Sequence, residues 1–158
     1  MTMSALQVET EIESSLELVW LAFTQTDRVI QWFAPDANIE PRLGGAYELF
    51  FDPSNREQMG TKGCFLTLFE PKERLGFTWK GPDDFASLMN QDNALTYVLV
   101  TLSEQAGKTK VVIEHFGWKE SEEWGKARAW HEMAWSQVLA SLKSALETGK
   151  GDLCCVPS

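Results

Sequence analysis

Apolar and polar residues alternate in several short stretches of the chain, which is the pattern of strands that bury one face. The first is Leu6 to Glu13, where glutamate or glutamine separates apolar and threonine side chains. Further β-rich stretches follow the turn sequence Gly44-Gly45. They are Tyr47–Phe51, Gly60–Glu70, Leu75–Lys80, Leu95–Leu102 and Thr109–Gly117. Because mostly short loops join these strands, the pattern predicts a mostly antiparallel sheet.

Two short helices are predicted between the first strand and the rest of the sheet. Ser14-Ser15 precedes an apolar run that begins at Leu18, and serine before such a run favours a helix start. A second helix is expected from Asp27 to Phe33, before Pro35 stops it. Later in the chain, Gly81 opens a loop that we expect to reach about Asn93.

The last predicted element is a long amphipathic helix. Ser121 and the two glutamates after it are typical of a helix start, and Gly149 is typical of its end. Between them, apolar positions recur every three or four residues, which predicts about seven turns with one buried stripe. The stripe consists of Trp124, Ala127, His131, Ala134, Trp135, Val138, Leu142, Ala145 and Leu146.

Length and charge narrow the class of protein. A chain of 158 residues buries roughly 70% of its unfolded surface, enough for one domain, which we place at residues 1–150, with a flexible tail at 151–158. A net charge of −9 disfavours nucleic acid and anionic membranes as partners. Neither a signal peptide nor a membrane span is evident, so we expect a cytoplasmic protein whose three cysteines are reduced.

Five short motifs along the chain resemble those of the activator of heat-shock-protein-90 ATPase homologue-like family, in the START-like (SRPBCC) superfamily. They occur in the family's order, at Val19–Thr24, Gln31–Pro35, Pro41–Tyr47, Glu70–Trp79 and Met133–Leu142. Ala134 stands where the last motif usually has glycine. The resemblance implies an α+β helix-grip fold, in which a curved antiparallel sheet of six to seven strands wraps around the C-terminal helix. It also implies a cavity between sheet and helix, since relatives bind hydrophobic small molecules.

The alternation of the strands and the helix stripe together predict which side chains face this cavity. We expect an apolar lining with two imidazoles, although each of these side chains could instead fill the core. The candidate ligand-binding residues are Trp32, Phe33, Tyr47, Leu49, Phe51, Phe65, Phe77, Trp79, Val98, His115, Trp124, His131 and Trp135.

His115 and His131 are the candidate polar groups of the pocket. Two imidazoles near one cavity could hydrogen-bond a ligand or transfer a proton. The alternative is a pair of structural histidines bonded to the backbone or to neighbouring side chains. A metal would need a third ligand, and no motif supplies one, so we expect neither a metal nor a cofactor and assign no catalytic residue.

Three functions from different classes remain open at this stage. The first is binding of a small hydrophobic or aromatic molecule, such as a lipid, a polyketide or a flavonoid-like compound, without catalysis. The second is a cyclase- or hydratase-like enzyme that uses a pocket histidine. The third, a co-chaperone that stimulates a heat-shock protein 90 ATPase, rests on the family name alone. A homodimer is also compatible with the sequence.

Overall fold

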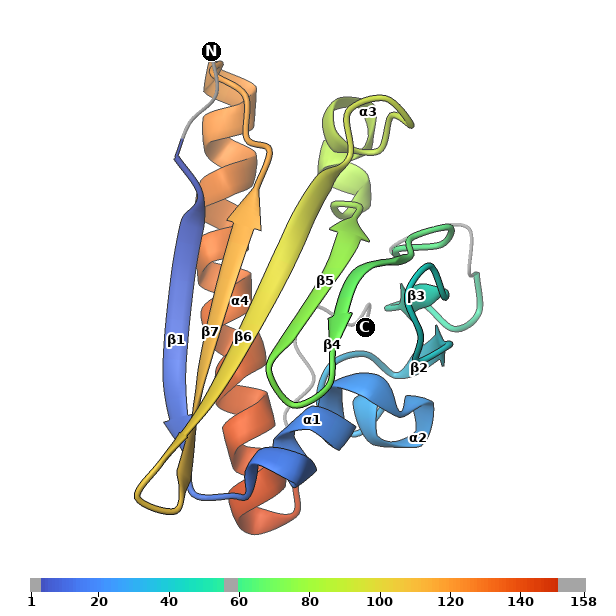
Figure 1. Ribbon diagram of the computed structural model, residues 1–158. Helices are drawn as coiled ribbons and strands as arrows, with labels where there is room; N and C mark the ends of the chain where they lie inside the picture. The colour runs from blue at the N-terminus through green and yellow to red at the C-terminus, as the bar shows by residue number, and fades with distance from the viewer. Residues whose placement is uncertain (1–3, 56–59, 151–158) are drawn as a thin grey trace.

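A computed structural model describes residues 4–55 and 60–150 of the chain (Figure 1). It has the predicted α+β architecture, with two short helices after the first strand and one long helix last. In chain order the elements are β1 (Leu6–Ile12), α1 (Leu16–Thr24), α2 (Thr26–Val29), β2 (Asp36–Ile39), β3 (Tyr47–Phe50), β4 (Leu66–Glu70), β5 (Arg74–Trp79), the 3-10 helix η1 (Asp83–Phe85), α3 (Ala86–Met89), β6 (Thr96–Gln105), β7 (Lys108–Phe116) and α4 (Glu122–Thr148). The predicted tail at 151–158, with Cys154 and Cys155, lies outside the described residues.

The strands form a five-stranded antiparallel sheet in the order β1-β7-β6-β5-β4, beside a two-stranded antiparallel ladder of β2 and β3. The ladder is linked to the chain around β4 by two isolated bridges, Ala46 with Phe65 and Phe50 with Gly60. Beside the second bridge, the hydroxyl of Thr61 accepts a hydrogen bond from the Leu49 N–H (2.8 Å). The described residues thus form seven strands, within the predicted number, although the strands are divided between two sheets.

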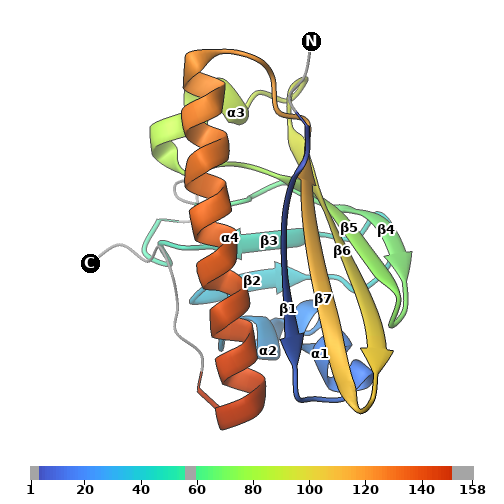
Figure 2. The same ribbon diagram turned by 90° about the vertical axis from the view of Figure 1, so that its left-hand side faces the viewer.

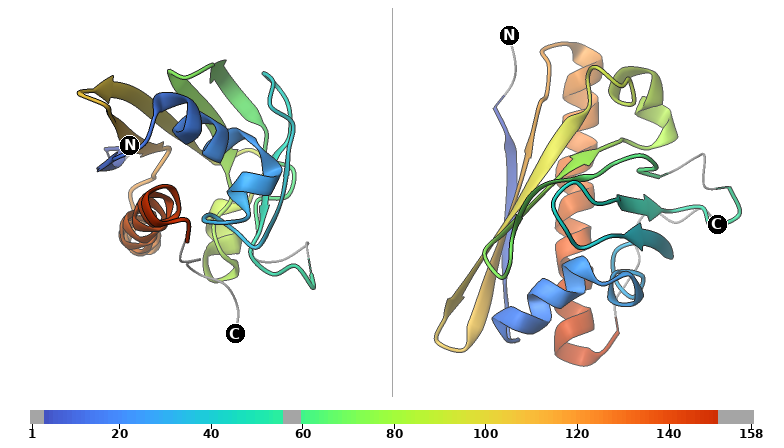
Figure 3. Two further views of the ribbon diagram at one scale, coloured as in Figure 1. Left: turned by 90° about the horizontal axis from the view of Figure 1, so that it is seen from below. Right: turned by 45° about the vertical axis from the view of Figure 1, so that its right-hand side comes forward.

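α4 lies across the concave face of the sheet (Figures 2 and 3). The predicted boundaries are correct: the Ser121 hydroxyl accepts a hydrogen bond from the Trp124 N–H (3.1 Å), and Gly149 ends the helix with a positive φ of 85°. All predicted stripe positions from Trp124 to Leu142 are buried, whereas Ala145 and Leu146 near the end are partly buried. The helix is thus the cover of the sheet that its periodicity predicted.

Side chains of α4 also occupy the open edge of β1, which runs beside the helix in Figure 2. Arg128 donates to the Ala5 carbonyl (3.3 Å), and Lys143 donates to the Glu11 carbonyl (2.6 Å). Such contacts give partners to backbone groups that an edge strand leaves unpaired. They fix the position of α4 relative to the sheet.

The predicted inward orientation of Phe65 is wrong, because its side chain is 45% exposed whereas Leu66 beside it is buried. The register of β4 shifts between Leu66 and Leu68. A bulge of this kind inserts one residue and reverses the alternation on one side of it. Phe69, beyond the bulge, packs edge-on against Trp20 with ring centroids 5.3 Å apart, so counting back from it by twos gives the wrong face for Phe65.

The segment after β5 also differs from the prediction. In place of a loop from Gly81 to about Asn93, the chain forms η1 and α3. The side chain of Asn90 closes this segment, because its amide accepts from the Gly81 N–H (2.8 Å) and donates to the Gly81 carbonyl (3.0 Å). Within the described parts of the chain, no helix is both long enough and apolar enough to cross a membrane.

Candidate ligand-binding pocket

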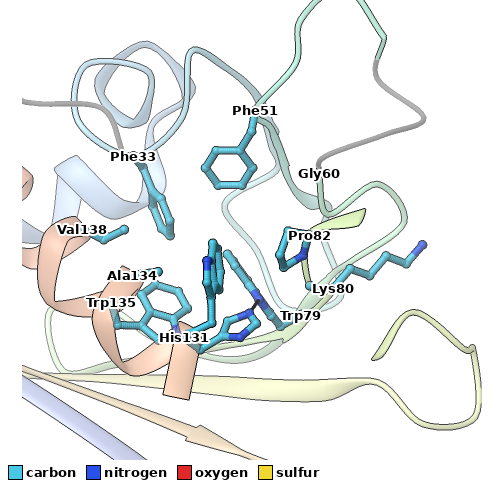
Figure 4. A pocket seen from close by; sticks show the side chains of 12 residues that line it. Phe33, Phe51, Gly60, Trp79, Lys80, Pro82, His131, Ala134, Trp135 and Val138 are labelled. Carbon is cyan, nitrogen blue, oxygen red and sulfur yellow. Dashed lines mark hydrogen bonds between the residues drawn. The ribbon is translucent and has the colours of Figure 1, made fainter. Parts of the chain in front are cut away.

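A pocket lies between the end of β5 and the middle of α4, and it is lined almost entirely by apolar and aromatic side chains (Figure 4). Its cavity volume is about 40 Å³. An apolar cavity of about 150 Å³ holds a benzene molecule, so this one accepts less than a phenyl ring unless a wall moves. The lining residues are Phe33, Phe51, Gly60, Trp79, Lys80, Gly81, Pro82, Trp130, His131, Ala134, Trp135 and Val138.

Three buried aromatic rings form the inner wall. Trp79 on β5 and Trp135 on α4 have ring centroids 4.8 Å apart, and Phe33, which follows α2, lies 6.2 Å from Trp79 and 5.7 Å from Trp135. Rings at these distances support one another through dispersion and quadrupole contacts. The wall is therefore closely packed, whereas Phe51 and Trp130, which also line the pocket, are only partly buried.

His131 lies at the pocket wall, but the protein already uses both of its ring nitrogens. The indole N–H of Trp79 donates to Nε2 (3.2 Å). Because an indole N–H can only donate, Nε2 accepts, and the ring proton is on Nδ1, which donates to the Ala127 carbonyl (2.8 Å). Burial lowers the pKa of His131 to about 4. The ring is therefore neutral near pH 7, and the lone pair that would take a proton is occupied.

His115 on β7 is bonded in the same way, deeper in the core. The Trp135 indole N–H donates to Nδ1 (3.0 Å), so the proton is on Nε2, which donates to the Thr96 hydroxyl (2.8 Å). Burial, with a smaller contribution from His131, holds the pKa of His115 well below its usual value. The two imidazole centroids are 5.3 Å apart and the rings are perpendicular. This bonding matches the structural interpretation of both histidines and gives neither a free lone pair for general base catalysis.

The pocket gathers five of the predicted residues, Phe33, Phe51, Trp79, His131 and Trp135. The other predicted residues, apart from Phe65, are buried in the core away from it. These are Trp32, Tyr47, Leu49, Phe77, Val98, His115 and Trp124. Tyr47, for example, stacks on Phe77 with centroids 4.3 Å apart and donates its hydroxyl to the Phe23 carbonyl (2.8 Å). These side chains therefore pack against one another and do not line this pocket.

Sequence reasoning missed several lining residues. Lys80, Gly81 and Pro82 follow β5 directly, and only the path of the chain after the strand brings them to the pocket. Trp130 lies beside the predicted stripe of α4, and its ring is 4.8 Å from that of His131. The signal available in the sequence was its position next to His131, at the border of the stripe. Among the described residues, no group of three or more His, Cys, Asp or Glu side chains is placed to hold a metal ion.

Comparison with known proteins gives a family and a fold. The sequence profile of the family described as "Activator of Hsp90 ATPase homolog 1-like protein" matches residues 13–147. No curated protein matches the chain.

Solved structures share the fold at low sequence identity. Protein MLL2253 from Mesorhizobium loti has a TM-score of 0.71 and 23% identity, over 90% of this chain and 96% of that one. The Aha1 protein of Colwellia psychrerythraea, described as a dimer, has a TM-score of 0.72 and 22% identity, over 94% and 100%. DynU16, a protein in the dynemicin biosynthetic locus, has a TM-score of 0.71 and 21% identity, over 94% of this chain and 49% of that one. Because the profile match covers most of the sequence, the chain belongs to the activator of Hsp90 ATPase homolog 1-like family.

Proposed function

We propose that the protein binds a small hydrophobic or aromatic molecule and holds an apolar part of it in the pocket between β5 and α4. The observation that carries this proposal is that the closely packed rings of Phe33, Trp79 and Trp135 border a cavity. A concave, mostly apolar site with rigid aromatic walls is typical of small-molecule binding.

The size of the cavity limits how such a molecule enters. About 40 Å³ accepts an alkyl end or the edge of a ring, so a larger body must remain outside or displace part of the wall. The displaced side chains would be Phe51 and Trp130, which are partly buried, and not the closely packed Trp79 and Trp135. Each Å² of apolar ligand surface removed from water contributes about 25 cal/mol.

The bonding of the histidines disfavours the enzyme hypothesis. A catalytic base needs a lone pair directed at its substrate, and indole N–H groups occupy those of His115 and His131. The co-chaperone hypothesis has no specific support in the pocket. An ATPase assay with added heat-shock protein 90 would test it directly, and stimulation of the ATPase in the absence of any small-molecule binding would favour it.

Ligand binding should be lost when the pocket is filled from α4. Wild-type protein is expected to bind members of a flavonoid- and polyketide-like panel saturably, with quenching of tryptophan emission and roughly micromolar affinity. Ala134 is buried and lines the pocket, so Ala134→Leu should weaken binding at least about tenfold by occupying the space. Fluorescence titration measures both.

Ala129→Leu is the matched control, because it makes the same change at an exposed position of the same helix. It should leave the affinity unchanged. Thermal unfolding of both variants checks that each is folded. A panel without any saturable binder would reject the proposal, as would equal binding by the Ala134→Leu variant and wild-type protein.

A further inference from the structure

We infer that the ligand is an amphipathic anion whose apolar part enters the pocket while its anionic group binds beside the ammonium group of Lys80. This inference rests on the proposed function and adds the chemical class of the ligand. It starts from a second hollow, the polar bowl, which is lined by the polar side chains of Lys62, Lys80, Asp83, Ser87, Asn90 and Gln91.

The pocket and the polar bowl adjoin, because Gly60 and Lys80 line both. Their volumes differ greatly, at about 40 Å³ for the pocket and about 650 Å³ for the bowl. If the pocket walls stay in place, the bowl offers room for the body of a ligand larger than an alkyl group. Such a ligand has an apolar end and a polar body.

Most hydrogen-bonding groups of the bowl that the structure describes already have partners within the protein. The Asn90 amide is bonded to both backbone groups of Gly81, and the Gln91 amide donates to the Ser87 carbonyl (3.1 Å). Lys80 differs, because its ammonium group donates to the Lys62 carbonyl (2.7 Å), whereas an ammonium group has three hydrogens to donate. Across residues 4–55 and 60–150, Lys80 forms no ion pair.

The side chain of Lys80 joins the apolar and the charged regions. Lys80 lines the apolar pocket. Figure 4 shows its side chain extending away from Trp79, with the ammonium nitrogen at the end farthest from the aromatic rings. A lysine in this arrangement covers apolar surface with its methylenes and presents its charge to solvent. The protein as a whole carries a net charge of −9, which disfavours the binding of anions in general. Lys80, which forms no ion pair among the described residues, makes the bowl a local exception.

A pair of dyes that differ in one anionic group tests this inference. Anilinonaphthalene sulfonate and N-phenylnaphthylamine share a fluorophore, and only the first carries a sulfonate. We expect the wild-type protein to bind the sulfonate dye about tenfold more tightly than the neutral dye, as measured by fluorescence titration. Added salt should lower the affinity for the sulfonate dye and leave the affinity for the neutral dye unchanged.

Substitution of Lys80 should remove this preference. Because Lys80 also lines the pocket, the quantity to compare is the ratio of the two affinities. Lys80→Met keeps an apolar chain of similar length, so it should lower the affinity for the sulfonate dye about tenfold relative to that for the neutral dye. Lys80→Arg keeps the charge and should retain the preference. Lys110→Met, which changes the net charge equally at a distant lysine paired with Glu9, should have no effect.

The outcomes separate this inference from the proposed function. If both dyes bind equally and Lys80→Met changes neither, the inference fails while binding in the pocket stands. The inference also fails if Lys110→Met lowers the affinity for the sulfonate dye as Lys80→Met does. It fails as well if Ala134→Leu lowers the affinity for the neutral dye but not that for the sulfonate dye, since the sulfonate dye would then bind elsewhere. If neither dye binds, the proposed function fails together with the inference.

Discussion

Replacing Trp135 by alanine is expected to lower the free energy of unfolding by about 3–5 kcal/mol, as for other large core aromatics. Trp135 is 2% exposed and lies in the buried stripe of α4. The substitution removes its contacts with Trp79 and Phe33. It also removes the N–H that bonds Nδ1 of His115, and a buried acceptor without a partner adds to the loss.

Chemical denaturation of the variant and of wild-type protein measures this loss. Trp135→Phe keeps one aromatic ring, so it should cost less than the alanine variant. Its remaining loss combines the missing hydrogen bond to His115 with the smaller ring. Met133→Ala is the control on the same helix, because Met133 is 47% exposed and its truncation should change stability by less than about 0.5 kcal/mol. A loss below about 1 kcal/mol for Trp135→Ala would contradict the packing described here.

Acidification from pH 7 toward pH 4 is expected to destabilise the protein through its two neutral histidines. In the unfolded chain an imidazole takes up a proton as the pH falls through about 6.5, whereas the folded-state pKa of His131 is lowered to about 4. Between these values the unfolded state binds more protons, so stability falls as the pH falls. His131 alone accounts for a loss of about 3 kcal/mol. His115 acts in the same direction, since its pKa is also lowered.

Denaturant titrations at intervals between pH 7 and pH 4.5 measure this slope. The exposed carboxyls of Glu40 and Glu147, whose pKa values are lowered by hydrogen bonds to the backbone, lose their contributions only at lower pH. His131→Gln supplies an amide oxygen for the Trp79 N–H without a titrating group. It should reduce the slope by up to about 1.4 kcal/mol per pH unit. Stability that is constant from pH 7 to pH 5 would show that the two imidazoles do not behave as buried neutral groups.

The sequence predicted the elements whose pattern is repeated over many residues. The stripe of α4 and its boundaries at Ser121 and Gly149 are confirmed, because periodic burial and capping are both local properties of a helix. Two features were missed for the opposite reason. β2 is only four residues long, and η1 with α3 occupies a stretch rich in turn-forming residues, so neither leaves a clear period in the sequence.

The candidate site was only partly predictable. Alternation identified Trp79 and the helix stripe identified His131 and Trp135 as inward side chains, and the structure brings all three to the pocket. The same reasoning applied equally to Tyr47 and Phe77, which stack on each other in the core. A burial pattern cannot separate these two groups, because side chains in the core and side chains at a cavity wall both point inward.

By itself, the sequence determined the order of the longer strands and helices, the family and most of the side chains that avoid water. The tertiary structure decided which of those side chains border open space and which partners the polar ones have. The bond between Trp79 and His131 joins residues 52 positions apart, and Lys80 reaches the pocket only through the path of the chain after β5. The physical reason is that burial follows the periodicity within one segment, whereas a cavity is the space left where several segments, distant in sequence, fail to fill one volume.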